Sequence, residues 1–189
     1  MKIGIIGFGK MGKTIAQKAV NKNFEILCVF DIANIGENIG KYIGKETSVV
    51  ISNANKIGEI LKELKEKPDV IIDFSHAKEI EERVKIIAKE KINIVIGTTG
   101  ISDEQKKEIF EAVKKEDIGL VMSPNMSVGV NVYWKIIEYA GKILKSYGFE
   151  AEIIEEHHKE KKDAPSGTAK KIQEILNKIY NKEIPAHSI

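Results

Sequence analysis

The chain has 189 residues, of which 42% are hydrophobic and 31% charged, so it can bury the core of one large domain or two small ones. Lysine and glutamate nearly balance to a net charge of +2, and this balance favours neither nucleic acid nor an anionic membrane as a partner. No apolar run approaches bilayer-spanning length, and a strand is predicted from residue 2, so we expect no signal peptide, no membrane anchor and a cytoplasmic protein.

Short β-branched runs alternate with longer segments of helical period up to about residue 122. This alternation predicts repeated βα units on a parallel sheet. The predicted strands are residues 2–6, 24–30, 49–51, 69–74, 93–96 and 119–122. The predicted helices are residues 11–21, 57–66, 78–89 and 102–115, the last opened by a capping box from Ser102 to Gln105. The glycine-rich residues 32–48 are expected to be irregular or loosely helical.

The alternation changes after Pro124, and we place a domain boundary near residues 125–130. A helix at 131–147, a strand at 151–155 and a last helix at 168–179 are predicted beyond it. The predicted fold class is α/β: a Rossmann-type doubly wound parallel sheet over residues 1–127 and a smaller α+β domain over residues 128–189.

Cys28 is the only cysteine and lies in an apolar run. It cannot form a disulfide within the chain, which fits a reducing compartment. We interpret it as a small core residue rather than a nucleophile, because buried cysteines are usually inert.

A glycine-rich turn follows the first predicted strand. Its sequence, Gly7-Phe8-Gly9-Lys10-Met11-Gly12, has the GxGxxG spacing and opens an amphipathic helix, which is the context of the dinucleotide-binding fingerprint. Glycines in this turn allow a pyrophosphate to approach the N–H groups of the helix start. The alternative is a structural strand-to-helix turn.

Asp31 ends the second predicted strand, where a carboxylate accepts hydrogen bonds from a ribose diol and repels a 2′-phosphate. We therefore predict NADH as the preferred cofactor. NADPH stays possible because Lys10 or Lys41 could reach a phosphate. Asp31 could instead serve only as a turn residue.

Three further predicted strands end in polar turns. Ligands of open parallel sheets bind beyond the carboxyl ends of the strands, so we expect these turns to hold the nicotinamide and its ribose. The turns are Asp73-Phe74-Ser75-His76, Gly97-Thr98-Thr99-Gly100 and Ser123-Pro124-Asn125-Met126. Each alone could be an ordinary loop, and we expect His76 to be only a solvated loop histidine.

Two histidines follow the strand predicted at 151–155. Neighbours on a strand point to opposite faces, so His157 and His158 cannot chelate one ion, and no metal site is expected. We interpret the imidazoles as groups for proton transfer or hydrogen bonding, with a polar strand edge as the alternative.

A Ser-Gly-Thr turn stands directly before the last predicted helix. Free N–H groups and hydroxyls at a helix start bind carboxylate or phosphate, which makes Ser166, Gly167 and Thr168 candidate anion ligands. The lysines nearby would by themselves form only a solvated face. Taken together, a histidine, a lysine and an anion site predict a carboxylated substrate that is protonated after hydride arrives.

These residues resemble those of one family, the 4-hydroxy-tetrahydrodipicolinate reductases (dihydrodipicolinate reductases) of diaminopimelate and lysine biosynthesis. The run from His157 to Ala169, HHxxKxDAPSGTA, resembles the family signature almost in full. Segments 73–75, 97–100 and 124–132 resemble its other recurring segments, and the resemblance runs from residue 1 to the end of the chain.

The resemblance implies that His157 is the general acid/base and Lys161 a proton donor. It implies that His158, Ser166, Gly167 and Thr168 hold the carboxylates of a small dicarboxylate substrate. Hydride would pass from NAD(P)H to a conjugated imine ring, in a homotetramer assembled through the C-terminal domain. The residues implied for the cofactor are Gly7, Phe8, Gly9, Lys10, Met11, Gly12, Asp31, Phe74, Gly97, Thr98, Thr99, Ser123, Pro124, Asn125 and Met126.

Two departures from the family pattern bear on function. The family's glycine turn has an extra residue and an arginine before Met-Gly, where this chain has Lys10, which weakens the prediction of cofactor preference. The chain also stops after Ile184–Ile189, where the family continues into a glycine-rich stretch, further strands and a final helix. We hypothesise that the 189-residue form binds NADH but reduces substrate poorly; turnover equal to that of a longer form would count against this.

Two other functions stay open. One is a nucleotide-binding protein without catalysis, which NADH binding without substrate-dependent NADH oxidation would favour. The other is a different small nicotinamide-dependent imine or amino-acid dehydrogenase, which would lack the HHxxKxDAPSGT run.

Overall fold

A computed structural model describes residues 1–157 and 164–189. The chain divides into two compact units, Met1–Ser123 and Pro124–Ile189, and each is described separately below.

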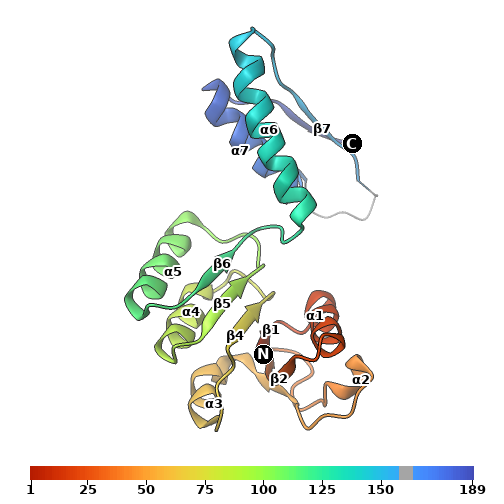
Figure 1. Ribbon diagram of the computed structural model, residues 1–189, viewed down its shortest axis with the longest axis vertical. Helices are drawn as coiled ribbons and strands as arrows, with labels where there is room; N and C mark the ends of the chain where they lie inside the picture. Colours follow the sequence, from red (N-terminus) through yellow and green to blue (C-terminus); the bar gives the residue numbers. More distant parts are fainter. Residues whose placement is uncertain (158–163) are drawn as a thin grey trace. The chain divides into compact units, whose positions relative to one another are not determined.

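The first unit is built on one six-stranded sheet (Figure 1). Its strands are β1 (Lys2–Ile6), β2 (Glu25–Asp31), β3 (Ile51–Asn53), β4 (Val70–Asp73), β5 (Asn93–Ile96) and β6 (Leu120–Met122). They pair in the order β3-β2-β1-β4-β5-β6, and every pair is parallel. This order has its reversal point between β1 and β4, and it confirms the predicted doubly wound sheet.

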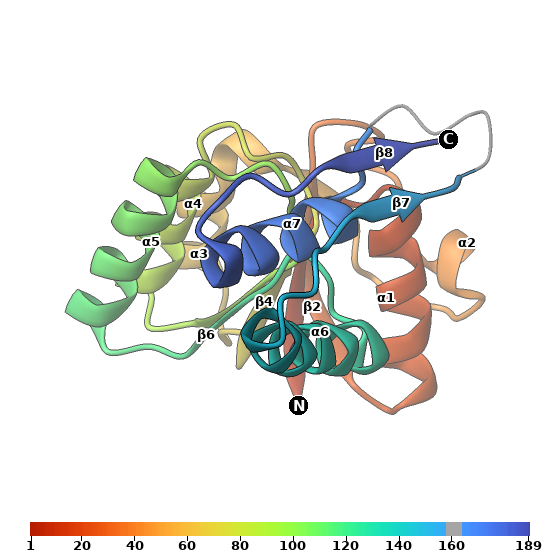
Figure 2. The same ribbon diagram turned by 90° about the horizontal axis from the view of Figure 1, so that it is seen from above.

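Helices cover both faces of this sheet (Figure 2). One face carries α1 (Lys10–Asn21) and the short α2 (Gly40–Ile43). The other face carries α3 (Ile57–Glu63), α4 (Ile80–Lys89) and α5 (Asp103–Glu116), with a short 3₁₀ turn at Ala54–Lys56 before α3. The capping box at the start of α5 is confirmed: the Ser102 side chain accepts from the Gln105 N–H, and the Gln105 side chain accepts from the Ser102 N–H.

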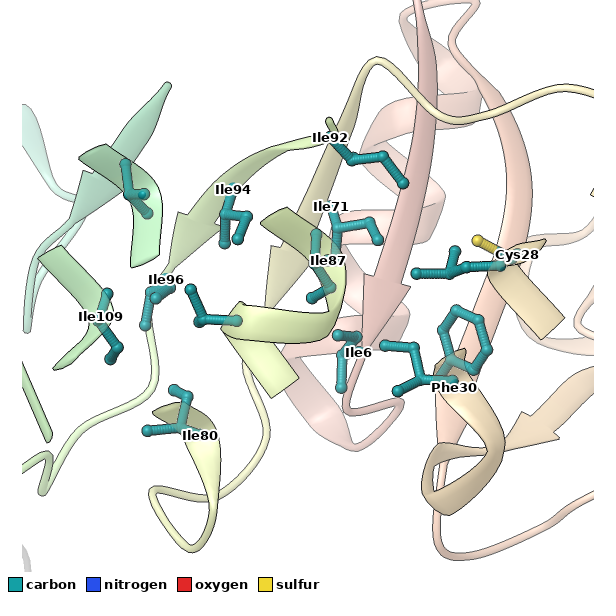
Figure 3. Packing of buried hydrophobic residues seen from close by; sticks show 14 residues of the cluster. Ile6, Cys28, Phe30, Ile71, Ile80, Ile87, Ile92, Ile94, Ile96 and Ile109 are labelled. Carbon is teal, nitrogen blue, oxygen red and sulfur yellow. The ribbon is translucent and has the colours of Figure 1, made fainter. Parts of the chain in front are cut away.

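The core of this unit is rich in isoleucine. Figure 3 shows side chains from the sheet and from α4 and α5 directed toward one another, with Cys28 among them. Full burial of such a side chain stabilises the fold by about 1.5–3 kcal/mol relative to exposure. Cys28 is 5% exposed, and burial raises the pKa of its thiol to about 12, so the thiol is protonated and unreactive at neutral pH.

In its described residues, the second unit contains two helices and a two-stranded sheet (Figure 1). Helix α6 spans Val128–Ser146, α7 spans Gly167–Tyr180, and strands β7 (Ile153–Glu155) and β8 (Ala186–Ser188) pair in parallel. Among its described residues, one small apolar cluster is buried, formed by Ile153, Ala169, Leu176 and Ile184.

Helix α6 and strand β8 differ from the sequence prediction. Helix α6 begins at Val128 rather than 131 because the Ser127 hydroxyl accepts from the Val130 N–H and caps the helix start. Strand β8 was not predicted, since three residues carry no periodic signal and become a strand only by pairing with β7. Among the described residues, no helix combines the length and apolar character needed to cross a bilayer.

Candidate active site

The carboxyl ends of five strands are joined by backbone hydrogen bonds. Each residue just past a strand donates its N–H to the last residues of a neighbouring strand. The donors and acceptors are Gly7 to Phe30 (2.8 Å), Phe74 to Ile6 (2.9 Å), Gly97 to Asp73 (2.9 Å) and Ser123 to Ile96 (3.1 Å). The predicted glycine turn, the starts of the turns at 73–76 and 97–100, and Ser123 therefore lie at the carboxyl end of the sheet, where open parallel sheets bind ligands.

Each glycine of the fingerprint has a separate steric reason. Gly7 has φ +84°, and a Cβ there would lie 2.5 Å from the Phe74 carbonyl oxygen, so this tight turn admits only glycine. A Cβ on Gly12 would lie 2.0 Å from the Gly7 oxygen, so α1 packs directly on the turn. A Cβ on Gly9 would have no described atom within 4 Å, which leaves the helix start open to an approaching group. These are the roles that the dinucleotide fingerprint gives its three glycines, and the turn fits a pyrophosphate.

The other residues of the turn divide between core and surface. Phe8 is 3% exposed and packs edge-on against the ring of Tyr42, with centroids 5.6 Å apart. Gly9, Lys10 and Met11 are exposed at the start of α1. Backbone N–H groups are therefore accessible where the turn meets the helix, and the buried Phe8 side chain holds the turn against the core.

Asp31, the last residue of β2, faces the same turn. Its Oδ2 accepts from the Phe8 N–H, and its Oδ1 accepts from the N–H groups of Ile32 (2.6 Å) and Ala33 (2.9 Å). The carboxylate is thus held beside the glycine turn, and Oδ2, which accepts only one of these bonds, has a second lone pair for a further donor. Asp31 acts as a turn former in this arrangement, and its position also suits a ribose.

Asp73 is a buried carboxylate, 1% exposed, at the end of β4. Its Oδ1 accepts from the hydroxyls of Ser75 (2.6 Å) and Thr98 (2.9 Å), and its Oδ2 lies 3.4 Å from Arg83 Nε. The Arg83 guanidinium also donates to the carbonyl of His76 at 2.6 Å. A buried charge is tolerated only with a partner and satisfied hydrogen bonds, and this network supplies both.

This network was not predicted from the sequence. Arg83 is the only arginine in the chain and lies within α4, and nothing in its local sequence indicates a partner ten residues earlier. The network fixes the turn after β4 against the turn after β5. Thr98, 6% exposed, serves Asp73 here, whereas Thr99 is exposed to solvent.

Phe74 and Gly97 are in close contact. A Cβ on Gly97 would lie 2.1 Å from the tip of the Phe74 ring, so the ring rests on the Gly97 backbone. The ring is half-buried. The Phe74 N–H donates to Ile6, and the Asp73 network fixes the neighbouring residues Asp73 and Ser75. An apolar ring at the reversal point of the sheet is suited to pack against a flat heterocycle.

Residues 123–126 connect the two units. Ser123 ends the first unit with its N–H bonded to Ile96, and Pro124 begins the second. In the second unit, Asn125 Oδ1 accepts from the Ser127 N–H at 2.8 Å, and the Asn125 carbonyl accepts from the Asn131 side chain at 2.9 Å. Met126 is 39% exposed.

In the second unit, His157 and the start of α7 both lie next to the carboxylate of Glu155. Ser166 is buried and caps α7, its hydroxyl accepting from the Ala169 N–H at 3.1 Å. Gly167 is exposed, a Cβ on it would have no described atom within 4 Å, and Thr168 is half-buried beside it. The predicted site residues His158 and Lys161 lie outside the described residues.

Glu155, in β7, is the carboxylate that joins these groups, and no role was predicted for it from the sequence. Its Oε1 accepts from the Ser166 N–H (2.7 Å) and the Ser188 hydroxyl (2.8 Å), and its Oε2 lies 3.6 Å from His157 Nδ1. The hydrogen bonds from Ser166 hold the pKa of the Glu155 carboxyl below its usual range. The one available signal in the sequence was that Glu155 lies two residues before His157, a spacing that puts both side chains on the same face of a strand.

Within the described ranges, no group of three or more histidine, cysteine, aspartate or glutamate side chains could hold a metal ion.

Family models match almost the whole chain. The model described as "Dihydrodipicolinate reductase, N-terminus" matches residues 1–126, and "Dihydrodipicolinate reductase, C-terminus" matches residues 129–189.

Individual relatives point the same way. The chain is 42% identical over 185 residues to the 4-hydroxy-tetrahydrodipicolinate reductase of Methanocaldococcus jannaschii, covering 93% of this chain and 65% of that protein. It is 37% identical to the reductase of the same name from Archaeoglobus fulgidus, covering 95% of this chain and 66% of that protein. The chain thus spans about two thirds of the length of these relatives.

One solved structure has a similar fold over the whole chain. It is a dipicolinate-bound dihydrodipicolinate reductase from Paenisporosarcina sp. TG-14, with a TM-score of 0.72 and 27% identity. The match covers 100% of this chain and 78% of that one.

Proposed function

Because this chain belongs to the dihydrodipicolinate reductase family, we propose that it takes part in the NAD(P)H-dependent reduction of 4-hydroxy-tetrahydrodipicolinate to tetrahydrodipicolinate. The observation that carries the proposal is the glycine turn, in which Gly7, Gly9 and Gly12 each have the steric role that dinucleotide binding requires. Relatives of the same name, and a neighbour whose structure contains dipicolinate, support the substrate class.

The proposed reaction replaces a ring hydroxyl by hydrogen. A hydride is added to the conjugated imine, and the hydroxyl leaves with one proton as water. The nicotinamide supplies the hydride when it is bound. The protein must therefore bind an anionic ring and deliver or accept protons, and we assign proton transfer to the imidazole of His157, with Lys161 as a further proton donor.

The cofactor would be held at the carboxyl ends of the strands of the first unit. Backbone N–H groups at the start of α1 suit the pyrophosphate, and the Asp31 carboxylate suits the adenosine ribose. The Phe74 ring, with the turns at 97–99 and 123–126, would hold the nicotinamide end.

We propose NADH as the preferred cofactor, with NADPH also accepted. The Asp31 carboxylate would repel a 2′-phosphate. Lys41, a candidate partner for that phosphate, is already paired with Glu37 at 2.5 Å. This pairing supports the preference, because a neutralised ammonium attracts a phosphate less.

The substrate's carboxylates would be held at the start of α7. The first N–H groups of a helix have no partner within the helix, so those of Gly167 and Thr168 suit an anion, with Ser166 fixing the cap. We assign His158 to the same carboxylates.

We further propose that the protein works in the cytoplasm as a homotetramer assembled through its second unit. Large apolar side chains of that unit are exposed, including Val132 (52%), Tyr139 (71%) and Ile154 (67%). Such patches are typical of association surfaces.

The proposal is tested by His157→Gln. We expect kcat to fall by about two to four orders of magnitude, the usual contribution of a general acid/base, while NADH affinity stays unchanged. His187→Gln is the matched control, because His187 lies in the same unit, is exposed and pairs with Glu152. An unchanged kcat in His157→Gln would remove His157 from the chemistry.

A further inference from the structure

We propose that Glu155 is a positioning residue that orients the His157 imidazole with its proton on Nδ1. The inference rests on the proposed function, in which His157 transfers the proton. It is based on the geometry of the Glu155 carboxylate, which contacts residues of three segments of the second unit.

One oxygen of this carboxylate is fixed. Glu155 Oε1 accepts from the Ser166 N–H at the start of α7 and from the Ser188 hydroxyl in β8, at 2.7 Å and 2.8 Å. Two donors from two different elements hold the side chain in one conformation. The side chain is only 11% exposed, so few other conformations are open to it.

The other oxygen faces His157. Glu155 Oε2 is buried and has no hydrogen-bond partner among the described residues, and it lies 3.6 Å from His157 Nδ1. A buried carboxylate oxygen without a donor is costly. A small approach of the imidazole, with its proton on Nδ1, would give Oε2 a charge-assisted hydrogen bond.

The charge needed for this role is present at neutral pH. Hydrogen bonds from Ser166 lower the pKa of the Glu155 carboxyl, so it is ionised there. In the described part of the chain, the groups acting on this carboxylate are Ser166 from α7, Ser188 from β8 and His157, and only His157 can carry charge. The ion pair therefore forms when the imidazole is protonated.

Two consequences follow for proton transfer. A proton held on Nδ1 by Glu155 leaves Nε2 as the nitrogen that exchanges a proton with the substrate. The carboxylate also fixes the direction in which Nε2 points, because it holds the opposite side of the ring. The His157 side chain is 38% exposed, which leaves it accessible.

The test is Glu155→Gln, which keeps an acceptor for Ser166 and Ser188 but removes the charge. The ring ¹⁵N shifts of the neutral histidines are recorded by NMR, and His157→Gln identifies the His157 signals. We expect the His157 proton to move from Nδ1 to Nε2 in Glu155→Gln, because the amide does not attract it as the carboxylate does. An unchanged tautomer would overturn the proposal.

Glu152→Gln is the matched control. Glu152 pairs with His187 at 2.8 Å, another carboxylate–imidazole pair in the same unit. Removing its charge should leave the His157 tautomer unchanged. A change in the His157 tautomer equal to that in Glu155→Gln would show a general charge effect and contradict a specific role for Glu155.

The wild-type protein gives a second test that does not depend on how the variant folds. The ¹⁵N shifts of neutral His157 should show the proton on Nδ1, and a proton on Nε2 would contradict the proposal. Because neither NMR readout requires turnover, failure of the proposed reaction is detected separately, as absence of substrate-dependent NADH oxidation by the wild type. In an active protein, Glu155→Gln should also lower kcat, with little change in the KM for NADH.

Discussion

At the scale of single residues, two carboxylates join segments that lie apart in the sequence. Asp73 at the end of β4 pairs with Arg83 in α4, and Glu155 in β7 accepts from Ser166 and lies beside His157. The steric roles of Gly7, Gly9 and Gly12 depend instead on the local backbone of one turn.

Asp31 gives a prediction about cofactor choice. Asp31→Asn keeps an acceptor for the Phe8 N–H but removes the charge that suits a ribose diol and repels a phosphate. We expect KM to rise about tenfold for NADH, the size of one lost charge-assisted hydrogen bond, and to rise less for NADPH. Steady-state kinetics with both cofactors measure this, and equal losses would mean that Asp31 only forms the turn.

Cys28 gives a prediction about the integrity of the first unit. Because burial raises the pKa of its thiol to about 12, a thiol-specific reagent at pH 8 should label the native protein far more slowly than the urea-unfolded chain. Added NADH should slow labelling further, since a ligand that binds only the folded state stabilises it. Labelling of the native protein as fast as that of the unfolded chain would contradict the buried position.

At the scale of elements, long periodic helices and buried strands were predicted well, and short elements were not. Strand β5 matches its prediction, and α5 starts where its capping box indicates. Strand β8 and the one-turn α2 are too short for periodicity, and their existence depends on neighbours. Helix α3 ends at Glu63, three residues before its predicted end, because Leu64 leaves the helix with ψ 125°.

Helices α6 and α7 predict a sensitivity to acid. Lys142 and Lys135 lower the pKa of Glu138 to about 2, and Lys171 and Lys178 do the same for Glu174. A carboxyl whose folded pKa is depressed contributes stability that is present above its unfolded value near 4.5 and is lost as pH falls toward about 2. The stability of the second unit should therefore decline over this window.

Urea unfolding followed by circular dichroism at several pH values measures this decline. The double variant Glu138→Gln, Glu174→Gln should lose less stability than the wild type between pH 5 and pH 2. The difference should shrink in high salt, because these pairs lie near the surface. Equal declines in the two proteins would show that the ion pairs contribute nothing.

At the scale of the whole molecule, the alternation of strands and helices changes after Pro124, the residue at which the second unit begins. The first unit carries the residues suited to a dinucleotide, and the second carries His157 with the start of α7. Only the local part of the proposed anion site could be predicted. The Ser166 cap was visible as a motif, whereas the Glu155 carboxylate that accepts from the Ser166 N–H was not.

On the proposed function, the first unit binds the nicotinamide cofactor and the second binds the anionic substrate. The decisive experiment follows the absorbance of reduced nicotinamide while the protein is incubated with NADH and enzymatically generated 4-hydroxy-tetrahydrodipicolinate. We expect a loss of absorbance that requires both the substrate and His157. Saturable NADH binding with no substrate-dependent loss would contradict the proposed function and indicate a protein that binds the nucleotide without catalysis.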